Sequence, residues 1–371
     1  MMAFTSDEQA FMARAIELAG QGRYSAKPNP CVGCVIVQDK QIIGEGWHQR
    51  TGEPHAEVHA LNQASDAANG ATAYVTLEPC SHQGKTPPCA DALIDANIAR
   101  VVIAMQDPNP LVSGQGIEKL RAAGIDVSIG LMEEEAESLN IAFLHKMKTA
   151  QPFIMSKVAM SLDGKTAMAS GESQWITGAE AREDVHRLRA ESGIVMTGVG
   201  TVLTDNPQLT ARDGLGSYAV KQPQIVVLDS KLKTPLDAAL FNSDVEVTLL
   251  TCSADLHAIQ ALRETGCNVE VISADANGQV DLPAVHRWLC EQPVNRVMIE
   301  AGALLNGACL QAGIVDELIV YMAPSALGAD ARGAFSMPTI SQLSDRIQLN
   351  YASMDQLGND IKLTYSVNKE V

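Results

Sequence analysis

Strand-like and helix-like segments alternate along this chain, and that alternation restricts the fold more than any other feature of the sequence. Runs of β-branched and apolar residues predict strands over residues 32–37, 42–47, 72–77, 101–105 and 127–129. Segments with helical periodicity predict helices over residues 6–20, 55–68, 91–96, 116–123 and 133–147. Ser6 and Gln9 are expected to form the capping box of the first helix. Such alternation is typical of an α/β sheet with helices on its faces.

The chain is expected to form two domains that meet near residue 150. Gln151 and Pro152 interrupt the helical pattern, and a new strand over residues 153–159 follows at once. Further strands are expected over residues 193–197, 224–228, 245–250, 269–272, 296–299 and, as the final element, 317–322. The helices between them are expected over residues 179–191, 256–265, 282–290 and 304–311. We therefore predict one domain over residues 1–150 and another over residues 151–371.

The charge of the chain argues against nucleic acid or anionic membrane as a partner. The formal net charge is −17, and residues 1–150 contain 18 acidic and 11 basic residues, which leaves 26 acidic and 16 basic residues for the second half. Polyanions bind basic surfaces, and both halves are acidic. The N-terminal residues lack the pattern of a secretory signal, and no apolar run is long enough to span a bilayer. A cytoplasmic enzyme or binding protein is expected.

Four residues of the first half have the chemistry of a catalytic zinc site. His55 and Glu57 open an expected helix, Cys80 follows an expected strand and Pro79, and Cys89 comes nine residues later. One histidine and two cysteines leave the fourth position of a tetrahedral zinc open for water, whose pKa the ion lowers. A carboxylate that does not coordinate can carry a proton from that water to a leaving amine. We expect Cys80 to lie at a helix start, where the helix dipole also favours its thiolate.

A second cysteine pair resembles a C-x-x-C motif but is expected to be structural. Cys31 and Cys34 precede and enter an expected strand, so no helix N-terminus is available to stabilise a thiolate. Side chains three residues apart on a strand point to opposite faces. The eight cysteines of the chain are expected to be reduced, and this pair is expected to pack in the core.

The second half lacks the G-x-G-x-x-G fingerprint of many dinucleotide-binding domains. Gly198 and Gly200 follow an expected strand without a third glycine, which is a weak signal by itself. Glu300-Ala301-Gly302-Ala303-Leu304 joins a strand to a helix through small residues. The backbone there could receive a pyrophosphate at the helix start, or the segment could be only a tight connection.

The motifs of the first half resemble those of a known family. The zinc-dependent base deaminases share the histidine, glutamate and Pro-Cys pattern, usually with two residues between the cysteines, whereas this chain has eight. That longer insert resembles the deaminase half of the bifunctional deaminase–reductases of riboflavin biosynthesis. The matching motifs are Pro28-Asn29-Pro30, Gly52-Glu53-Pro54-His55-Ala56-Glu57-Val58, Thr76-Leu77-Glu78-Pro79-Cys80-Ser81-His82 and Asp107-Pro108-Asn109-Pro110.

The second half resembles the reductase half of the same family. The matching motifs are Lys157, Ser161-Leu162-Asp163-Gly164, Gly171-Glu172-Ser173-Gln174-Trp175-Ile176-Thr177, Asp205-Asn206-Pro207 and Glu300-Ala301-Gly302. The resemblance implies an α/β chain with a cytidine-deaminase-like three-layer α/β/α domain followed by a dihydrofolate-reductase-like α/β domain. It implies zinc in the first domain and NADPH in the second. It also implies homo-oligomerisation, as a dimer or tetramer, through the reductase domain. The apolar segment 317–322 also suggests that two chains pair there.

The implied reaction has two steps on a small pyrimidine ribose phosphate. The 2-amino group of 2,5-diamino-6-ribosylamino-4(3H)-pyrimidinone 5′-phosphate is hydrolysed, and the ribosyl group is then reduced to ribityl. The expected product is 5-amino-6-(5-phospho-D-ribitylamino)uracil.

The resemblance also assigns residues to each site. In the deaminase it implies His55, Cys80 and Cys89 as zinc ligands, Glu57 as the proton carrier, and a pyrimidine pocket lined by Asn29, His48, His82 and Lys85. In the reductase it implies Lys157 and Asp205 beside the nicotinamide, and substrate contacts at Ser173, Arg189, Leu209, Arg212 and Glu300. The two arginines suit a phosphate, because a guanidinium can bind it in bidentate fashion. The implied cofactor contacts are Ala159, Trp175, Thr201, Asp205, Ser230, Gly302, Ala303, Leu304, Leu305, Asn306, Gly307 and Ala308.

Two other functions compete with this one. A nucleoside or tRNA deaminase with an unrelated second domain would act on cytidine or tRNA and would not bind NADPH. A zinc-stabilised binding protein would have a closed site of four ligands and would tolerate the loss of Glu57. The acidic charge and the long insert between the cysteines count against the first alternative, and Glu57 itself counts against the second.

Overall fold

The computed structural model describes residues 4–81, 87–109, 113–216 and 218–368, which divide into two compact units. The first unit ends at Ala150 and also contains Tyr218–Lys221, and the second contains the rest of the chain from Gln151. Within the described residues, no helix is both long and apolar enough to cross a membrane.

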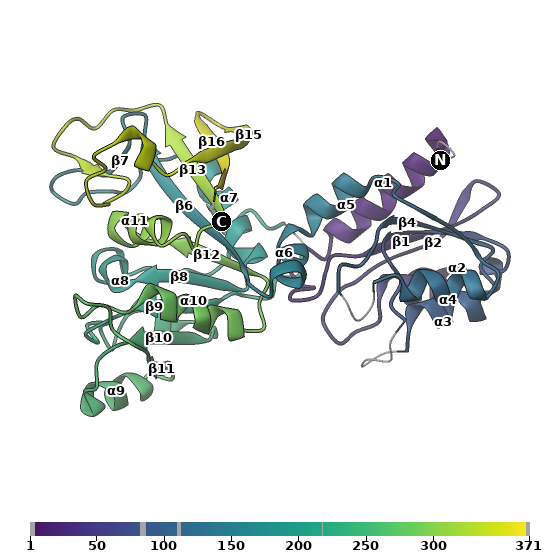
Figure 1. Ribbon diagram of the computed structural model, residues 1–371, viewed down its shortest axis with the longest axis horizontal. Coiled ribbons are helices and arrows are strands. Elements are labelled where there is room, and N and C mark those ends of the chain that lie inside the picture. The colour runs from purple at the N-terminus through teal and green to yellow at the C-terminus, as the bar shows by residue number, and fades with distance from the viewer. Residues whose placement is uncertain (1–3, 82–86, 110–112, 217, 369–371) are drawn as a thin grey trace. The chain divides into compact units, whose positions relative to one another are not determined.

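The first unit is built on a mixed sheet of five strands in the order β2-β1-β3-β4-β5 (Figure 1). The strands are β1 (Gly33–Gln38), β2 (Gln41–Trp47), β3 (Thr72–Leu77), β4 (Arg100–Met105) and β5 (Asp126–Ile129). β1 is antiparallel to both β2 and β3, and β3, β4 and β5 are parallel. The carboxyl ends of β3 and β4 therefore lie at one edge, where ligands bind in open α/β sheets.

Helices cover both faces of this sheet and make three layers. One face is covered by α2 (Ala56–Ala64), α3 (Cys89–Asp95) and α4 (Gln115–Ala122), and the short 3-10 helix η1 (Ser65–Ala68) follows α2. The other face is covered by α1 (Ser6–Gly20), α5 (Glu133–Leu139) and α6 (Ile141–Thr149). Small side chains, such as Ala60 of α2 and Ala15 of α1, let the helices approach the sheet closely. The three-layer α/β/α prediction is confirmed.

Two details of the helices differ from the prediction. The capping box of α1 is formed by Thr5 and Glu8, one residue before the expected pair, and the Glu8 carboxylate also binds Arg100. The segment expected as one helix is broken into α5 and α6 at Asn140. The buried Asn140 side chain accepts a hydrogen bond from Cys31 N (2.8 Å) and donates one to Cys31 O (3.0 Å). These bonds fix Asn140 outside helical geometry, and they tie α5–α6 to the segment before β1.

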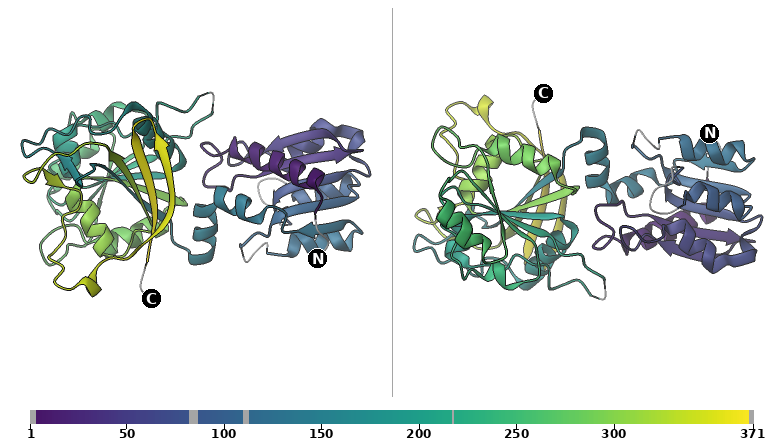
Figure 2. Two further views of the ribbon diagram at one scale, coloured as in Figure 1. Left: turned by 90° about the horizontal axis from the view of Figure 1, so that it is seen from above. Right: turned by 90° about the horizontal axis from the view of Figure 1, so that it is seen from below.

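The second unit contains a sheet of nine strands in the order β11-β10-β9-β8-β12-β6-β13-β16-β15. The strands from β11 to β13 in this order are parallel, and β16 and β15 are added antiparallel. Figure 2 shows these strands fanning out in a strongly twisted sheet. Their bounds are β6 (Phe153–Ser161), β8 (Ile194–Gly198), β9 (Gln224–Leu228), β10 (Val247–Thr251), β11 (Asn268–Val271), β12 (Arg296–Glu300), β13 (Glu317–Ala323), β15 (Leu349–Leu357) and β16 (Asp360–Val367).

Helices again pack on both faces of this second sheet. One face carries α7 (Ala179–Glu191), α8 (Val199–Asp205) and α9 (Leu256–Arg263), and the other carries α10 (Leu282–Glu291) and α11 (Ala303–Gln311). Trp288 of α10 is a large buried side chain on its face. Two short strands, β7 (Lys165–Ala167) and β14 (Arg332–Gly333), pair beside the main sheet, and η2 (Ala239–Asn242) and η3 (Leu343–Asp345) are 3-10 turns.

The end of the chain differs most from the prediction. β13 was expected to be the final element, but β15 and β16 follow it. β13 is paired with β6 on one side and β16 on the other, so it has no free edge through which a second chain could pair. The apolar character of residues 317–322 reflects burial inside one chain.

Candidate active sites

His55, Cys80 and Cys89 come together at the carboxyl end of β3 although they are up to 34 residues apart. His55 is the N-cap residue of α2, Cys80 follows β3, and Cys89 is the first residue of α3. Their potential ligand atoms all lie within 4.8 Å of one another. His55 Nδ1 is 3.2 Å from Cys89 Sγ and 3.6 Å from Cys80 Sγ. One imidazole and two sulfur atoms at this separation match three of the four ligands of a catalytic zinc.

The sequence predicted that Cys80 would lie at a helix start, and this is wrong. The helix α3 begins at Cys89 instead. Cys80 is in the connection between β3 and α3, and the backbone N–H of Cys89 donates to Cys80 Sγ over 3.3 Å. The pKa of Cys80 is lowered, first by the hydrogen bond from the Cys89 side chain and then by His55 and the Cys89 N–H. The thiolate of Cys80 is thus stabilised by the start of a helix to which it does not belong.

Glu57 lies beside the three ligands with its carboxylate buried. The residue is 3% exposed, and its Oε2 has no hydrogen-bond partner among the described residues. The pKa of Glu57 is raised, chiefly by burial and then by the neighbouring Cys80. A buried carboxylate oxygen without a hydrogen-bond partner destabilises the fold unless a ligand supplies that partner. The three ligands fit a metal ion, and Glu57 Oε2 is free to bind a reactant beside that ion.

Glu78 supports this site and was given no role in the sequence prediction. Its buried carboxylate accepts backbone N–H groups of Asp107, Gly114, Gly116 and Ile117 over 2.9–3.3 Å. Glu78 stands two residues before Cys80, and a Cβ at Gly116 would collide with Pro79 O. The start of α4 is therefore locked against the segment that carries Cys80. Only an acidic residue directly before Pro-Cys signals this in the sequence.

Asn29 and His48, two expected pocket residues, are in contact. Asn29 Nδ2 is 3.0 Å from His48 Nε2, and His48 Nδ1 is 3.4 Å from Pro54 O. Since a carbonyl only accepts, Nδ1 carries the proton and Nε2 accepts from the amide. Burial and then the nearby His55 lower the pKa of His48, which favours this neutral form. The other two expected pocket residues, His82 and Lys85, lie outside the described residues.

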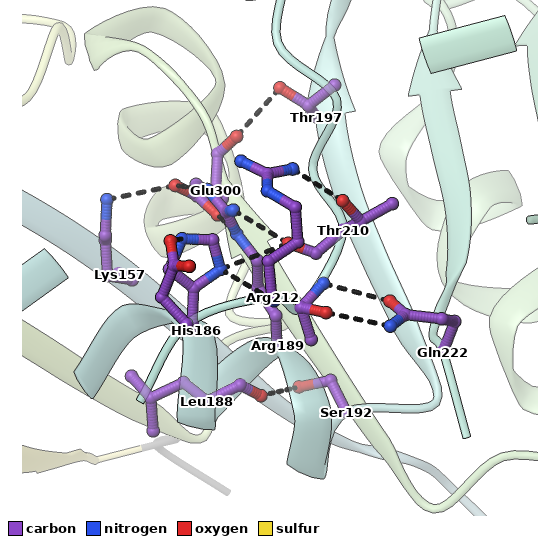
Figure 3. A network of polar contacts seen from close by, with 12 residues as sticks. Lys157, His186, Leu188, Arg189, Ser192, Thr197, Thr210, Arg212, Gln222 and Glu300 are labelled. Carbon is purple, nitrogen blue, oxygen red and sulfur yellow. Dashed lines mark hydrogen bonds and ion pairs between the residues drawn. The ribbon is translucent and has the colours of Figure 1, made fainter. Parts of the chain in front are cut away.

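In the second unit, Lys157, Arg189 and Glu300 form a largely buried ion-pair cluster (Figure 3). Arg189 of α7 makes a bidentate pair with Glu300 at the end of β12, with Nε–Oε2 and Nη2–Oε1 distances of 2.8 and 2.9 Å. Lys157, opposite Glu300 on the neighbouring strand β6, donates to Oε1 over 3.2 Å. Burial alone would raise the pKa of Glu300, but the charges of Arg189 and Lys157 outweigh it, and the pKa is lowered. The cluster carries one net positive charge.

The two arginines expected at the phosphate differ in exposure. The Arg189 side chain is 12% exposed, and its third contact, from Nη1, is with Thr210 O. Arg212 is exposed, and its Nη1 contacts Gln208 Oε1 (2.9 Å) and Thr210 Oγ1 (2.6 Å). Arg212 therefore has the guanidinium that a ligand could reach. Leu209, also expected at the substrate, is buried in the core, which leaves only its backbone for such a contact.

The segment expected to bind the cofactor is divided by the fold into an open and a closed part. Gly302 is the N-cap residue of α11, and Leu304 is 77% exposed. The helix starts directly after the central strand β12, where first-turn N–H groups can receive an anion. Asn306 is 2% exposed and bonds Ser156 and Ala301 O, and a Cβ at Gly307 would collide with Ser336 O. Asn306 and Gly307 thus hold the helix in place.

The remaining expected cofactor and substrate residues are spread around the carboxyl ends of the same strands. Ala159 lies on β6, Thr201 and Asp205 lie on α8, and Ser230 follows β9. Burial raises the pKa of Asp205, and the charge of Lys157 partly offsets that effect, so these two groups interact. Ser173 and Trp175 lie in the loop before α7, where Trp175 is 69% exposed and stacks with the Arg182 guanidinium at 4.7 Å.

Each half of the chain matches the model of a known protein family. Residues 5–105 match the cytidine and deoxycytidylate deaminase zinc-binding region. Residues 152–363 match the RibD C-terminal domain. The first match contains the His55, Cys80 and Cys89 cluster, and the second contains the Lys157, Arg189 and Glu300 cluster.

Relatives of known identity match this chain over nearly its whole length, and so over both halves. The riboflavin biosynthesis protein RibD of Escherichia coli K12 is 48% identical over 365 residues, which cover 96% of this chain and 98% of that protein. RibD of Aquifex aeolicus is 38% identical over 96% of this chain and 98% of its own length. Two solved structures each cover 98% of this chain and 99% of their own. They are Acinetobacter baumannii RibD, with a TM-score of 0.89 and 45% identity, and a Thermotoga maritima diaminohydroxyphosphoribosylaminopyrimidine deaminase/5-amino-6-(5-phosphoribosylamino)uracil reductase, with a TM-score of 0.85 and 34% identity.

Proposed function

Because this chain belongs to the RibD family, the bifunctional deaminases and reductases of riboflavin biosynthesis, we propose that each of its two units performs one of the two steps. The first unit deaminates 2,5-diamino-6-ribosylamino-4(3H)-pyrimidinone 5′-phosphate. The second reduces the ribosyl group of the product to ribityl with NADPH. The observation that carries the proposal is the His55, Cys80 and Cys89 cluster with the buried Glu57 beside it.

In the deamination, Glu57 carries the proton. His55, Cys80 and Cys89 would hold a zinc ion, and that ion would lower the pKa of a water molecule at the site. The oxygen of that water would bond to the ring carbon as the C–N bond to the amino group breaks, and Glu57 would carry the proton from the water to the amino group, which leaves as ammonia. The raised pKa of Glu57 suits both transfers, because this carboxyl group accepts a proton more readily than an exposed one and can then donate it to the amine. Asn29, oriented by His48, binds the pyrimidine ring, and His82 and Lys85 are proposed to act with it.

In the reduction, the ion-pair cluster orients the sugar end of the substrate. The start of α11 would hold NADPH, which would supply the hydride. Lys157 is held by Glu300 and directs a positive N–H toward the oxygen that gains charge, with Asp205 beside it. We assign the phosphate to Arg212, because Arg189 is paired with Glu300 and supports that carboxylate.

The proposal is tested by giving zinc-loaded, full-length protein the diaminopyrimidinone phosphate and NADPH together. We expect the absorbance of the reduced nicotinamide to fall, because the reductase receives its substrate from the deaminase. NADH in place of NADPH is expected to react more slowly. Release of ammonia without oxidation of either nicotinamide, even when the deaminated uracil is supplied, would contradict the reductase assignment. Oxidation only with that uracil would contradict the deaminase assignment.

Removing zinc is expected to separate the two activities. A chelator that strips the ion should abolish ammonia release, because the water would lose its acidity. Reduction of the deaminated uracil should continue, since Lys157, Glu300 and Arg212 belong to the other unit. Metal content is measured alongside both rates, and added zinc should restore deamination. Equal loss of both rates at unchanged protein stability would contradict the division of labour.

A cytoplasmic location and a homo-oligomer assembled through the second unit are parts of the same proposal. The apolar segment of β13 does not support the assembly, because it is covered within the chain. The edge strand β15 supports it better, since Tyr351 and Met354 are 65% and 59% exposed there.

A further inference from the structure

His186 connects the helix of Arg189 to the loop of Arg212, and the proposed mechanism does not use it. It lies on α7, three residues before Arg189, and is 8% exposed. Its Nδ1 is 3.2 Å from Arg212 N and 3.2 Å from Thr210 O, and its Nε2 is 3.2 Å from Asp213 Oδ2. Figure 3 shows the ring beside the two arginines.

The partners of the ring determine its protonation. A backbone N–H only donates, so Nδ1 must accept from Arg212 N to form that bond. The proton then sits on Nε2, where it is donated to the Asp213 carboxylate. The other neutral form would leave the Arg212 N–H without an acceptor and would turn a lone pair toward Asp213. The Nε2–H form therefore satisfies the Arg212 N–H and the Asp213 carboxylate, and it leaves Thr210 O to accept from Arg189 Nη1.

The surroundings also oppose a charged ring. Burial lowers the pKa of His186, and the positive charges of Arg189 and Arg212 lower it further, while Asp213 and the contact with Thr210 O act in the opposite direction. Arg189 lies on the same helix, and Arg212 and Asp213 lie on the loop that packs against it.

We propose that His186 is a positioning residue for the phosphate end of the reductase substrate: its neutral ring holds the Arg212 backbone, and its protonated ring releases it. The inference rests on the proposed function, in which Arg212 binds the phosphate. A second proton would place a donor at Nδ1 against the Arg212 N–H. Thr210 O, at the same distance, would become the partner of Nδ1, and the backbone at Arg212 would have to turn away.

The test uses two variants of His186: one keeps an acceptor for the Arg212 N–H but has no titrating ring, and the other has neither. In His186→Asn, Oδ1 stands the same number of bonds from Cα as Nδ1 and can accept the Arg212 N–H without titrating. In His186→Leu no acceptor remains. The reductase step is assayed with full-length protein, NADPH and the deaminated uracil, and KM and kcat are measured from about pH 5 to pH 8.

We expect His186→Leu to raise KM about three- to tenfold near neutral pH, the effect of one lost hydrogen bond, with little change in kcat. His186→Asn should restore a KM close to that of the unchanged protein. As the pH falls, KM of the unchanged protein should rise more steeply than KM of His186→Asn. The substrate phosphate titrates in this range as well, but it does so equally in every variant, so the difference between the two curves isolates His186.

Two results would overturn the inference. One is an identical pH profile for the unchanged protein and His186→Asn. The other is an Nδ1–H ring at neutral pH, detected from the ¹⁵N shifts of labelled histidine, which requires no variant to fold. Arg212→Met tests the underlying function separately. If this change leaves KM unaltered, the phosphate assignment fails, whatever the ring nitrogens show.

Discussion

Replacing Glu57 with glutamine is expected to slow ammonia release by roughly 10²- to 10⁴-fold, the usual contribution of a positioned acid–base group. Glutamine has nearly the same shape, so the 3% exposed site should keep its packing, but an amide cannot take a proton from water or return it to an amine. His55, Cys80 and Cys89 are untouched, and zinc content should remain at one ion per chain. The measurement is ammonia release with metal analysis of the same sample.

Glu53→Gln is the matched control for this variant. Glu53 lies in the same motif and its charge reaches His48, but it is outside the cluster of ligands. It should lower ammonia release only slightly, and neither variant should change the reduction of the deaminated uracil. Full deaminase activity in Glu57→Gln would refute the proton-carrying role. Loss of zinc from that variant would show instead that Glu57 holds the metal.

Local patterns account for the parts of the structure that the sequence predicted well. The segments expected over residues 72–77, 179–191 and 224–228 coincide with β3, α7 and β9. The two strands are continuous runs of buried residues, and the helix buries residues at helical spacing. β15 was missed because its nine residues are almost all exposed, so no alternation of buried and exposed positions marks it. Its pairing with β16 depends on the hairpin rather than on burial.

The candidate sites show the same limit. His55, Cys80 and Cys89 could be proposed from spacing, because each stands at the end of a predictable element. Glu78 and His186 could not, because their partners lie 24 to 39 residues further along the chain and only the fold brings them together. The role of a buried polar group depends on its hydrogen-bond partners, and the sequence alone does not show which residues these are.

The second large effect is expected on stability, from Arg189→Met. The Arg189 and Glu300 side chains are 12% and 14% exposed, and the change leaves a buried carboxylate with only the Lys157 contact. Breaking a buried ion pair in this way costs about 3–5 kcal/mol. Hydrogen exchange of the full-length protein should therefore accelerate more than about a hundredfold in α7 and β12 peptides, while α2 peptides of the other unit stay unchanged. Arg287→Met is the control, because Arg287 is 68% exposed and its pair with Asp281 is worth little.

The pH dependence of this loss identifies its cause. The pKa of Glu300 is lowered in the folded protein, so its ion pairs stabilise the fold above the unfolded-state pKa of about 4.3, and that contribution disappears only as the pH falls through the lowered value. Without Arg189, burial dominates and the pKa of Glu300 rises, so in the variant the ionised carboxylate opposes folding at neutral pH. The difference in exchange between the two proteins should consequently narrow as the pH falls from about 7 toward 4, after correction for intrinsic exchange. A difference that is constant over this range would mean that Arg189 acts through packing of its side chain rather than through its charge.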